Sequence, residues 1–159
     1  MIISYRKWLE QVPSQISDDV LWKHTVYRYS LFLADISWHD RDKIIRKKKN
    51  FSLADQLHRS AGSISANISE GYSRNSQADK LRFYEYALGS AREARGWYYQ
   101  AKLVFSKQDL EFRLELLSQI IKLLLNIIHS VRKNHLSEYL TRYTTDTSKK
   151  RWQTTKIIL

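Results

Sequence analysis

The chain has 159 residues, of which 43% are hydrophobic, and a formal net charge of +11. This length suits one domain with its own core, and the absence of cysteine excludes disulfides, thiolate zinc sites and cysteine nucleophiles. The start lacks the apolar core of a signal peptide, and the most apolar run, residues 120–128, is too short and too polar to span a bilayer. We therefore expect a cytoplasmic protein without a membrane partner.

The first helix is predicted at about residues 18–42, after an N-terminal extension of residues 1–16. Ser17 suits the N-cap position, and Asp18 and Asp19 suit the positive end of the helix dipole. Polar residues crowd the segment 38–50, so we expect a fraying helix end or a connector there.

The second helix is predicted at about residues 51–70, and residues typical of helix ends and caps follow it. Its apolar residues are spaced four, four, three and four apart at Leu53, Leu57, Ala61, Ile64 and Ile68. Gly71 directly follows this stripe, which predicts a left-handed C-terminal cap. Ser76 and Asp79 resemble a capping box that begins the next helix, and so short a connection predicts antiparallel neighbours.

Two further long helices are predicted, at about residues 76–106 and 109–133. Gly89 and Gly96 lie seven residues apart on one face of the third helix, where small residues let another helix approach closely. The fourth helix has an apolar surface wider than one stripe, which favours burial against a second subunit.

The last segment, residues 134–159, is basic, rich in threonine and lacks helical periodicity. We expect it to be mobile or to order only against a partner. The sequence thus predicts an all-α fold, an antiparallel up-down four-helix bundle over residues 17–133 with an irregular basic C-terminal tail.

The positive charge is concentrated in the two flanks. Residues 1–50 carry a net charge of +4, residues 51–131 carry +2 and residues 132–159 carry +5. The flanks either bind a polyanion or merely keep the bundle soluble. Trp38 and Trp152 lie beside the two basic clusters, which slightly favours single-stranded nucleic acid. The candidate phosphate-binding residues are Arg46, Lys47, Lys48, Lys49, Arg142, Lys149, Lys150, Arg151 and Lys156.

The sequence carries no signature of an enzyme, a metal site or a cofactor site. No glutamate has a histidine three residues later, the five histidines lack zinc-ligand spacing, and there is no phosphate-binding glycine loop or G-x-S-x-G motif. Asp55 with Arg59, and Glu70 with Arg74, are expected to form surface ion pairs. Asn67 is expected to be a hydrogen-bonding anchor for the corner, which we favour over a role in ligand binding.

Residues 52–102 resemble the signature of the bacterial four-helix bundle family that includes the 23S ribosomal RNA intervening-sequence proteins. Ser60 and Ser69 stand where the family commonly has alanine, and residues 42–50 and the tail depart from the family pattern. The matching residues, which we expect to be mainly structural, include Gln56, Arg59, Asn67, Glu70, Gly71, Arg74, Phe83, Gly89, Ser90 and Glu93.

The resemblance implies an up-down bundle whose copies assemble into a ring, typically of five. It also implies a poorly defined function, since relatives include products of insertions in ribosomal RNA genes and, more distantly, retroelement accessory proteins that bind RNA. Two hypotheses follow for this chain. It is a non-enzymatic oligomeric adaptor that binds RNA or DNA phosphates with little sequence preference, or it is a scaffold whose partner is another protein.

Overall fold

The structure is a computed structural model that describes the backbone of residues 4–154 and the side chains of residues 4–134 and of Leu136. Within these residues it contains helices and no strand, which confirms the all-α class. The elements are α1 (Tyr5–Leu9), α2 (Ser14–Ser17), the 3₁₀ turn η1 (Val20–Lys23), α3 (Thr25–Lys48), α4 (Phe51–Tyr72), α5 (Gln77–Gln100), the 3₁₀ turn η2 (Lys102–Val104) and α6 (Lys107–Thr154).

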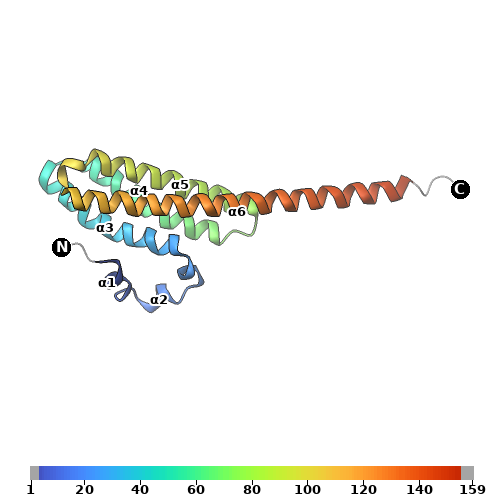
Figure 1. Ribbon diagram of the computed structural model, residues 1–159, viewed down its shortest axis with the longest axis horizontal. Coiled ribbons are helices and arrows are strands. Elements are labelled where there is room, and N and C mark those ends of the chain that lie inside the picture. Colours follow the sequence, from blue (N-terminus) through green and yellow to red (C-terminus); the bar gives the residue numbers. More distant parts are fainter. Residues whose placement is uncertain (1–3, 155–159) are drawn as a thin grey trace.

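The four long helices α3–α6 lie side by side around a shared core (Figure 1). The connections α3–α4 and α5–α6 lie at one end of the molecule, and the α4–α5 connection lies at the other. The fully buried side chains come from all four helices and include Phe32, Leu33, Ile44, Leu57, Ile64, Ile68, Tyr98, Leu117, Ile120 and Leu124.

The first predicted helix is wrong at both ends. It does not begin at Ser17, because the Asp19 side chain accepts from the Leu21 amide at 2.7 Å and caps the separate turn η1. His24 is extended, and α3 starts only at Thr25. At the other end the predicted connector is helical to Lys48, since Asp40 and Ile44 of this segment point into the core.

Lys49 separates α3 from α4 with a left-handed backbone, at a φ of 50°. The next residue, Asn50, then caps α4 by accepting from the Leu53 amide at 3.0 Å. A single left-handed residue followed by a side-chain cap lets one helix follow another almost without a loop.

The α4–α5 corner confirms one prediction and contradicts another. Ser76 caps α5 as expected, accepting from the Asp79 amide at 3.0 Å. Gly71 is not a left-handed cap, because no described glycine has a positive φ and α4 continues to Tyr72. Gly71 is buried where an added Cβ would lie 3.0 Å from Phe83 Cβ, so this position is small because α5 passes close by.

The two C-terminal helices also differ from their predicted bounds. The third helix ends at Gln100 rather than near residue 106, and η2 leads into α6. The predicted irregular tail is wrong as far as Thr154, because α6 continues to that residue and projects past the other helices (Figure 1). No glycine or proline follows Gly96 in the sequence, so nothing in this segment forces a helix to end.

The stretch Lys107–Asn134 of α6 is long and apolar enough to cross a membrane by length and composition. Core helices of soluble proteins also meet this criterion, and Leu117, Ile120 and Leu124 of this stretch are completely buried against the other helices. That the chain has no membrane partner stays a prediction.

Candidate nucleic-acid interface

The first predicted basic cluster lies at the C-terminal end of α3. Arg46, Lys47 and Lys48 occupy its last turn, Lys49 is its C-cap, and all four are exposed. Lysine and arginine side chains are favoured there, because the helix dipole places partial negative charge at a C-terminus. Lys47 Nζ also donates to the Val104 carbonyl oxygen at 3.0 Å, which joins the end of α3 to η2.

The α5–α6 connection brings two more cations to the same end of the molecule. Lys102 begins η2 and Lys107 begins α6, and both side chains are exposed. Lys107 Nζ lies 3.8 Å from the exposed Glu111 carboxylate, a weak pair in water. We call this surface the basic end, and it consists of Arg46, Lys47, Lys48, Lys49, Lys102 and Lys107.

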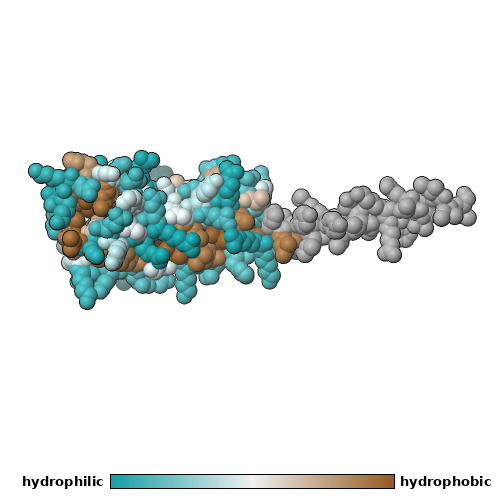
Figure 2. Space-filling view, turned by 90° about the horizontal axis from the view of Figure 1, so that it is seen from above, coloured by the Kyte–Doolittle hydropathy of each residue, from teal (hydrophilic) through white to brown (hydrophobic). Residues whose placement is uncertain are grey.

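Aromatic and apolar side chains are exposed beside these cations. Phe51 is 65% exposed at the first position of α4, and Tyr99 is 59% exposed in the last turn of α5. Lys102 Nζ lies 4.5 Å from the centre of the Tyr99 ring. Figure 2 shows apolar residues among hydrophilic ones at this end of the molecule. Cations interleaved with exposed rings suit the backbone and bases of a single strand.

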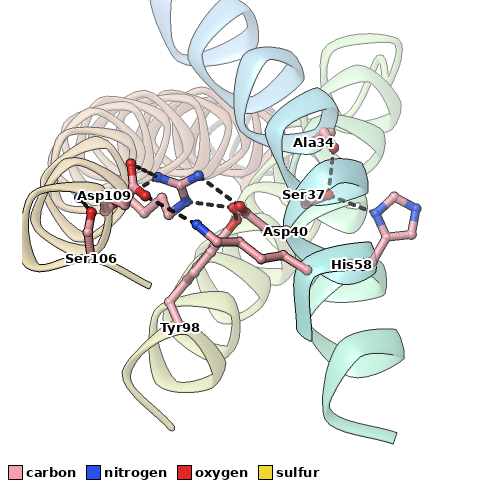
Figure 3. A network of polar contacts seen from close by, with 9 residues as sticks. Ala34, Ser37, Asp40, His58, Tyr98, Ser106 and Asp109 are labelled. Atoms are coloured by element: carbon pink, nitrogen blue, oxygen red, sulfur yellow. Dashed lines mark hydrogen bonds and ion pairs between the residues drawn. The ribbon is translucent and has the colours of Figure 1, made fainter. Parts of the chain in front are cut away.

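A buried ion pair fixes the helices that carry the basic end. Arg113 of α6 binds Asp40 of α3 with two hydrogen bonds, from Nε at 2.6 Å and from Nη2 at 2.7 Å. The Tyr98 hydroxyl of α5 donates to the same carboxylate at 2.9 Å. Figure 3 shows Asp40 and Tyr98 of this network, which come from different helices. Burial alone would lower the pKa of Arg113, but the Asp40 carboxylate outweighs it and holds that pKa above its usual value.

Asp109 extends this network toward the surface. Its carboxylate accepts from Lys43 Nζ at 3.3 Å, and its carbonyl oxygen accepts from Arg113 Nη1 at 2.7 Å. Burial raises the pKa of Asp109, but hydrogen bonds from Lys43 and Ser106 outweigh this effect and lower it. The start of α6 is thereby fixed against α3, which sets the position of Lys107 relative to the end of α3.

The structure does not bring the two predicted basic clusters together. Arg142, Lys149, Lys150 and Arg151 belong to the part of α6 that projects from the opposite end of the molecule (Figure 1). Their side chains, and Lys156 altogether, lie outside the described residues. Among the described side chains, the candidate interface is therefore the basic end alone.

Most of the family-motif residues lie on the outer surface of α4 and α5. The Glu70 and Arg74 side chains form an ion pair, and the Arg74 guanidinium lies 4.9 Å from the Phe83 ring centre. Asn67 donates to the Ser63 carbonyl oxygen of its own helix at 2.8 Å, so this bond does not anchor the corner as predicted. The other exposed motif residues are Arg59, Gly89 and Glu93, while Gln56 and Ser90 are half-buried.

The glycine prediction for α5 is not met within one chain. Gly89 and Gly96 are exposed, and an added Cβ at either would meet nothing within 4 Å. No other described helix of the same chain therefore packs closely against either glycine. The buried small residues of α5 are Ala87, Ala91 and Ala94.

Sequence reasoning missed the buried ion pair and two of the six residues of the basic end, Lys102 and Lys107. Asp40 occupies a core position between Ile36 and Ile44, four residues from each, and a charge in such a stripe signals a buried partner. Lys102 and Lys107 gave no such signal, because only the folding of α5 back to α6 places them beside Lys47. Among the described residues, no group of histidine, aspartate and glutamate side chains could hold a metal ion.

A family model described as 23S rRNA-intervening sequence protein matches residues 23–127 of the chain. The chain is also similar to the crystal structure of a protein with unknown function of the S23 ribosomal protein family from Bacteroides thetaiotaomicron VPI-5482. The TM-score is 0.62 at 28% sequence identity, over 65% of this chain and 98% of that one.

A further similarity is to one of the subunits of the mitochondrial glutamyl-tRNA(Gln) amidotransferase from Candida albicans (strain WO-1). The two chains are 34% identical over 74 residues, which make up 45% of this chain and only 15% of the amidotransferase chain. Because the match covers so little of the amidotransferase chain, it gives no information about the activity of the present chain.

Proposed function

Because the chain belongs to the 23S rRNA-intervening sequence protein family, we propose that it is a non-enzymatic adaptor that binds RNA or DNA through the phosphates. The observation that carries this proposal is the basic end. Three separate segments, the end of α3, the turn η2 and the start of α6, place six exposed cations on one surface. Lysine and arginine contacts to phosphates supply most of the affinity in sequence-independent binding.

The surface suits a backbone rather than a base sequence. Five of its six cations are lysines, whose ammonium groups act as point charges and do not read base edges with the paired hydrogen bonds of arginine. The exposed rings of Phe51 and Tyr99 stack on any base. Binding with little sequence preference follows.

The adaptor is proposed to be an antiparallel up-down four-helix bundle that assembles into a closed homo-oligomer, a pentamer by family resemblance. Two observations support assembly. Gly89 and Gly96 leave open space on the outer face of α5, and Leu125 of α6 is 44% exposed. A ring would repeat the basic end in every subunit, so weak phosphate contacts would act together. We place this assembly in the cytoplasm, without a membrane partner.

The alternative is a protein–protein assembly scaffold with no role in nucleic-acid binding. Exposed apolar side chains favour it, since Leu103 of η2 and Leu136 of α6 lie largely in solvent. Side chains of this kind mark protein-interaction surfaces when they gather into a patch. The adaptor hypothesis requires that the basic end bind RNA or DNA, whereas the scaffold hypothesis does not.

The experiment is to titrate fluorescently labelled generic RNA and duplex DNA with three proteins at low salt. The first is the parent, and the second carries glutamine at Lys48, Lys49, Lys102 and Lys107. Lys47 is kept because it donates to Val104. The third carries the same loss of charge elsewhere, with glutamine at the exposed residues Lys23, Arg92, Lys122 and Lys133.

The proposal predicts that the parent and the third protein bind both polymers and that the second binds weakly. A parent that binds neither polymer would exclude the adaptor and leave the scaffold. A truncation that removes residues 141–159 measures the share of the C-terminal cluster in the same assay. Equal loss in the second and third proteins would show that binding follows net charge and not the basic end.

A further inference from the structure

A groove runs along the outer face of α3 beside the basic end. The N-terminal helix α1 and the segment after it form one wall, and the start of α6 forms the other. Its volume is about 740 Å³, within the range of roughly 300–1,000 Å³ that holds small ligands. The lining includes Trp8, Gln11, Asp35, Trp38, Arg46 and Arg113. The wall formed by α1 lies outside the family match at residues 23–127.

We infer that this groove takes one unpaired nucleobase of a bound single strand, stacked on Trp38, with the adjoining phosphate on Arg46. The inference rests on the proposed function and names its preferred ligand. Arg46 makes the connection, because it belongs to the basic end and also lines the groove. A strand whose phosphates lie on the basic end therefore has one base at the mouth of the groove.

Trp38 offers a stacking surface that is held in place from behind. The side chain is 56% exposed, and its ring centre lies 4.1 Å from that of His58. His58 Nδ1 in turn lies 2.7 Å from Ser37 Oγ (Figure 3). Burial, and then the charge of Arg41, lower the pKa of His58, which favours the neutral form of the ring beside Trp38. An indole that is held by a neighbouring ring and more than half exposed can stack a base with little loss of side-chain entropy.

The charges inside the groove balance, and most of them are paired. Asp35, Asp40 and Asp109 line it together with Lys43, Arg46 and Arg113. Asp40 is already bound by Arg113 and Asp109 by Lys43. Asp35 Oδ2 accepts from Trp8 Nε1 at 2.6 Å, which leaves Oδ1 as an acceptor for the amino group of a base. Asp35 thus offers an acceptor to the amino or ring N–H group of a neutral base, while Arg46 offers its charge to the adjoining phosphate.

The groove also explains which polymer the protein should prefer. A base in a duplex is paired and stacked, and its removal costs a few kcal/mol. A single strand offers the same base at little cost. Binding to single strands should therefore depend on Trp38, and binding to duplex DNA should depend on the basic end alone.

The test compares the parent with Trp38→Ala and Trp38→Phe in binding to a single-stranded oligonucleotide, the same strand with abasic sites, and a duplex. Tyr86→Ala is the matched control, because Tyr86 is a half-exposed ring of α5 outside the groove and the basic end. We expect Trp38→Ala to lose roughly tenfold in single-strand affinity. Trp38→Phe should keep most of that affinity. Duplex and abasic binding should not change with either variant.

A second measurement requires no variant. An oligonucleotide that carries 4-thiouridine is photocrosslinked to the parent, and the modified peptide is identified by mass spectrometry. The expected adduct lies on the peptide that contains Trp38. If the parent binds neither polymer, the proposed function and this inference both fall. If the parent binds, but Trp38→Ala binds single strands equally well or the adducts lie only at Phe51 and Tyr99, this inference alone is overturned.

Discussion

Asp40 and Arg113, 73 residues apart in the sequence, form a two-pronged ion pair in the core that joins α3 to α6. They are only 2% and 3% exposed, and the Tyr98 hydroxyl supplies a third donor to the carboxylate. Such a pair costs desolvation energy, so its main consequence is specificity of arrangement rather than net stability. It fixes the position of α6 against α3 and hence the geometry of the basic end and the groove.

Removal of one partner of this pair should destabilise the fold strongly. We expect Asp40→Ala to lower the free energy of unfolding by about 3–5 kcal/mol, because the Arg113 guanidinium is then buried without its carboxylate. Urea denaturation measures the change. Asp55→Ala, in an exposed pair with Arg59, is the control and should cost less than about 1 kcal/mol. Similar small losses in both variants would contradict a buried Arg113 that depends on the Asp40 carboxylate.

Gly71→Ala should destabilise the α4–α5 packing. The new methyl group would lie 3.0 Å from Phe83 Cβ, so α5 would have to move. Overpacking costs about 1–3 kcal/mol, of which the better helix propensity of alanine returns up to about 1 kcal/mol. Gly62→Ala in the same helix has nothing within 4 Å and should be neutral or stabilising. An unchanged or higher denaturation midpoint for Gly71→Ala would show that α4 and α5 can accommodate the added methyl group at this position.

Stability should fall as the pH drops below about 6.5, and His58 should account for part of the loss. Its pKa is lowered from 6.5 in the fold by burial and by Arg41, against a smaller opposite effect of Asp55. The unfolded chain therefore takes up the proton first, and stability is lost between pH 6.5 and the lower folded pKa. The pKa of Asp109, lowered from 3.8, acts below this window. Thermal unfolding at pH 7.5 and 5.5 should show a smaller decrease for His58→Gln than for the parent, and equal decreases would refute this role.

The intact protein should be a closed oligomer in solution. The exposed glycines of α5 and the exposed Leu125 of α6 are the surfaces that we expect to be covered. Light scattering coupled to size exclusion should give a mass near five times 19.0 kDa at micromolar concentration. A monomeric mass would remove assembly from the proposal.

The parts of the fold that the sequence predicted are those with local causes. The stripe from Leu53 to Ile68 follows the helical period, and Ser76 caps α5 through an atom three residues away. The misplaced boundaries have non-local causes. Gly71 is small because Phe83 passes beside it, and α3 continues to Lys48 because the core accepts Asp40 and Ile44.

The candidate site divides in the same way. Arg46 to Lys49 stand out in the sequence as a run of charge. Lys102 and Lys107 do not stand out in the sequence. They join the basic end only because η2 lies against the end of α3, where Lys47 donates to Val104. The groove needs Trp8, Trp38 and Arg113 together, and these come from three elements that sequence periodicity does not place relative to one another.

The most direct measurement of the central claim is the salt dependence of binding to a single-stranded RNA. Each phosphate contact contributes a slope of about −0.7 in log K against log salt. The variant with glutamine at Lys48, Lys49, Lys102 and Lys107 should therefore have a slope less steep than that of the parent by about 3. The control with glutamine at Lys23, Arg92, Lys122 and Lys133 should keep the slope of the parent. Equal slopes for all three proteins, or a slope of zero for the parent, would contradict a phosphate-binding surface at the basic end.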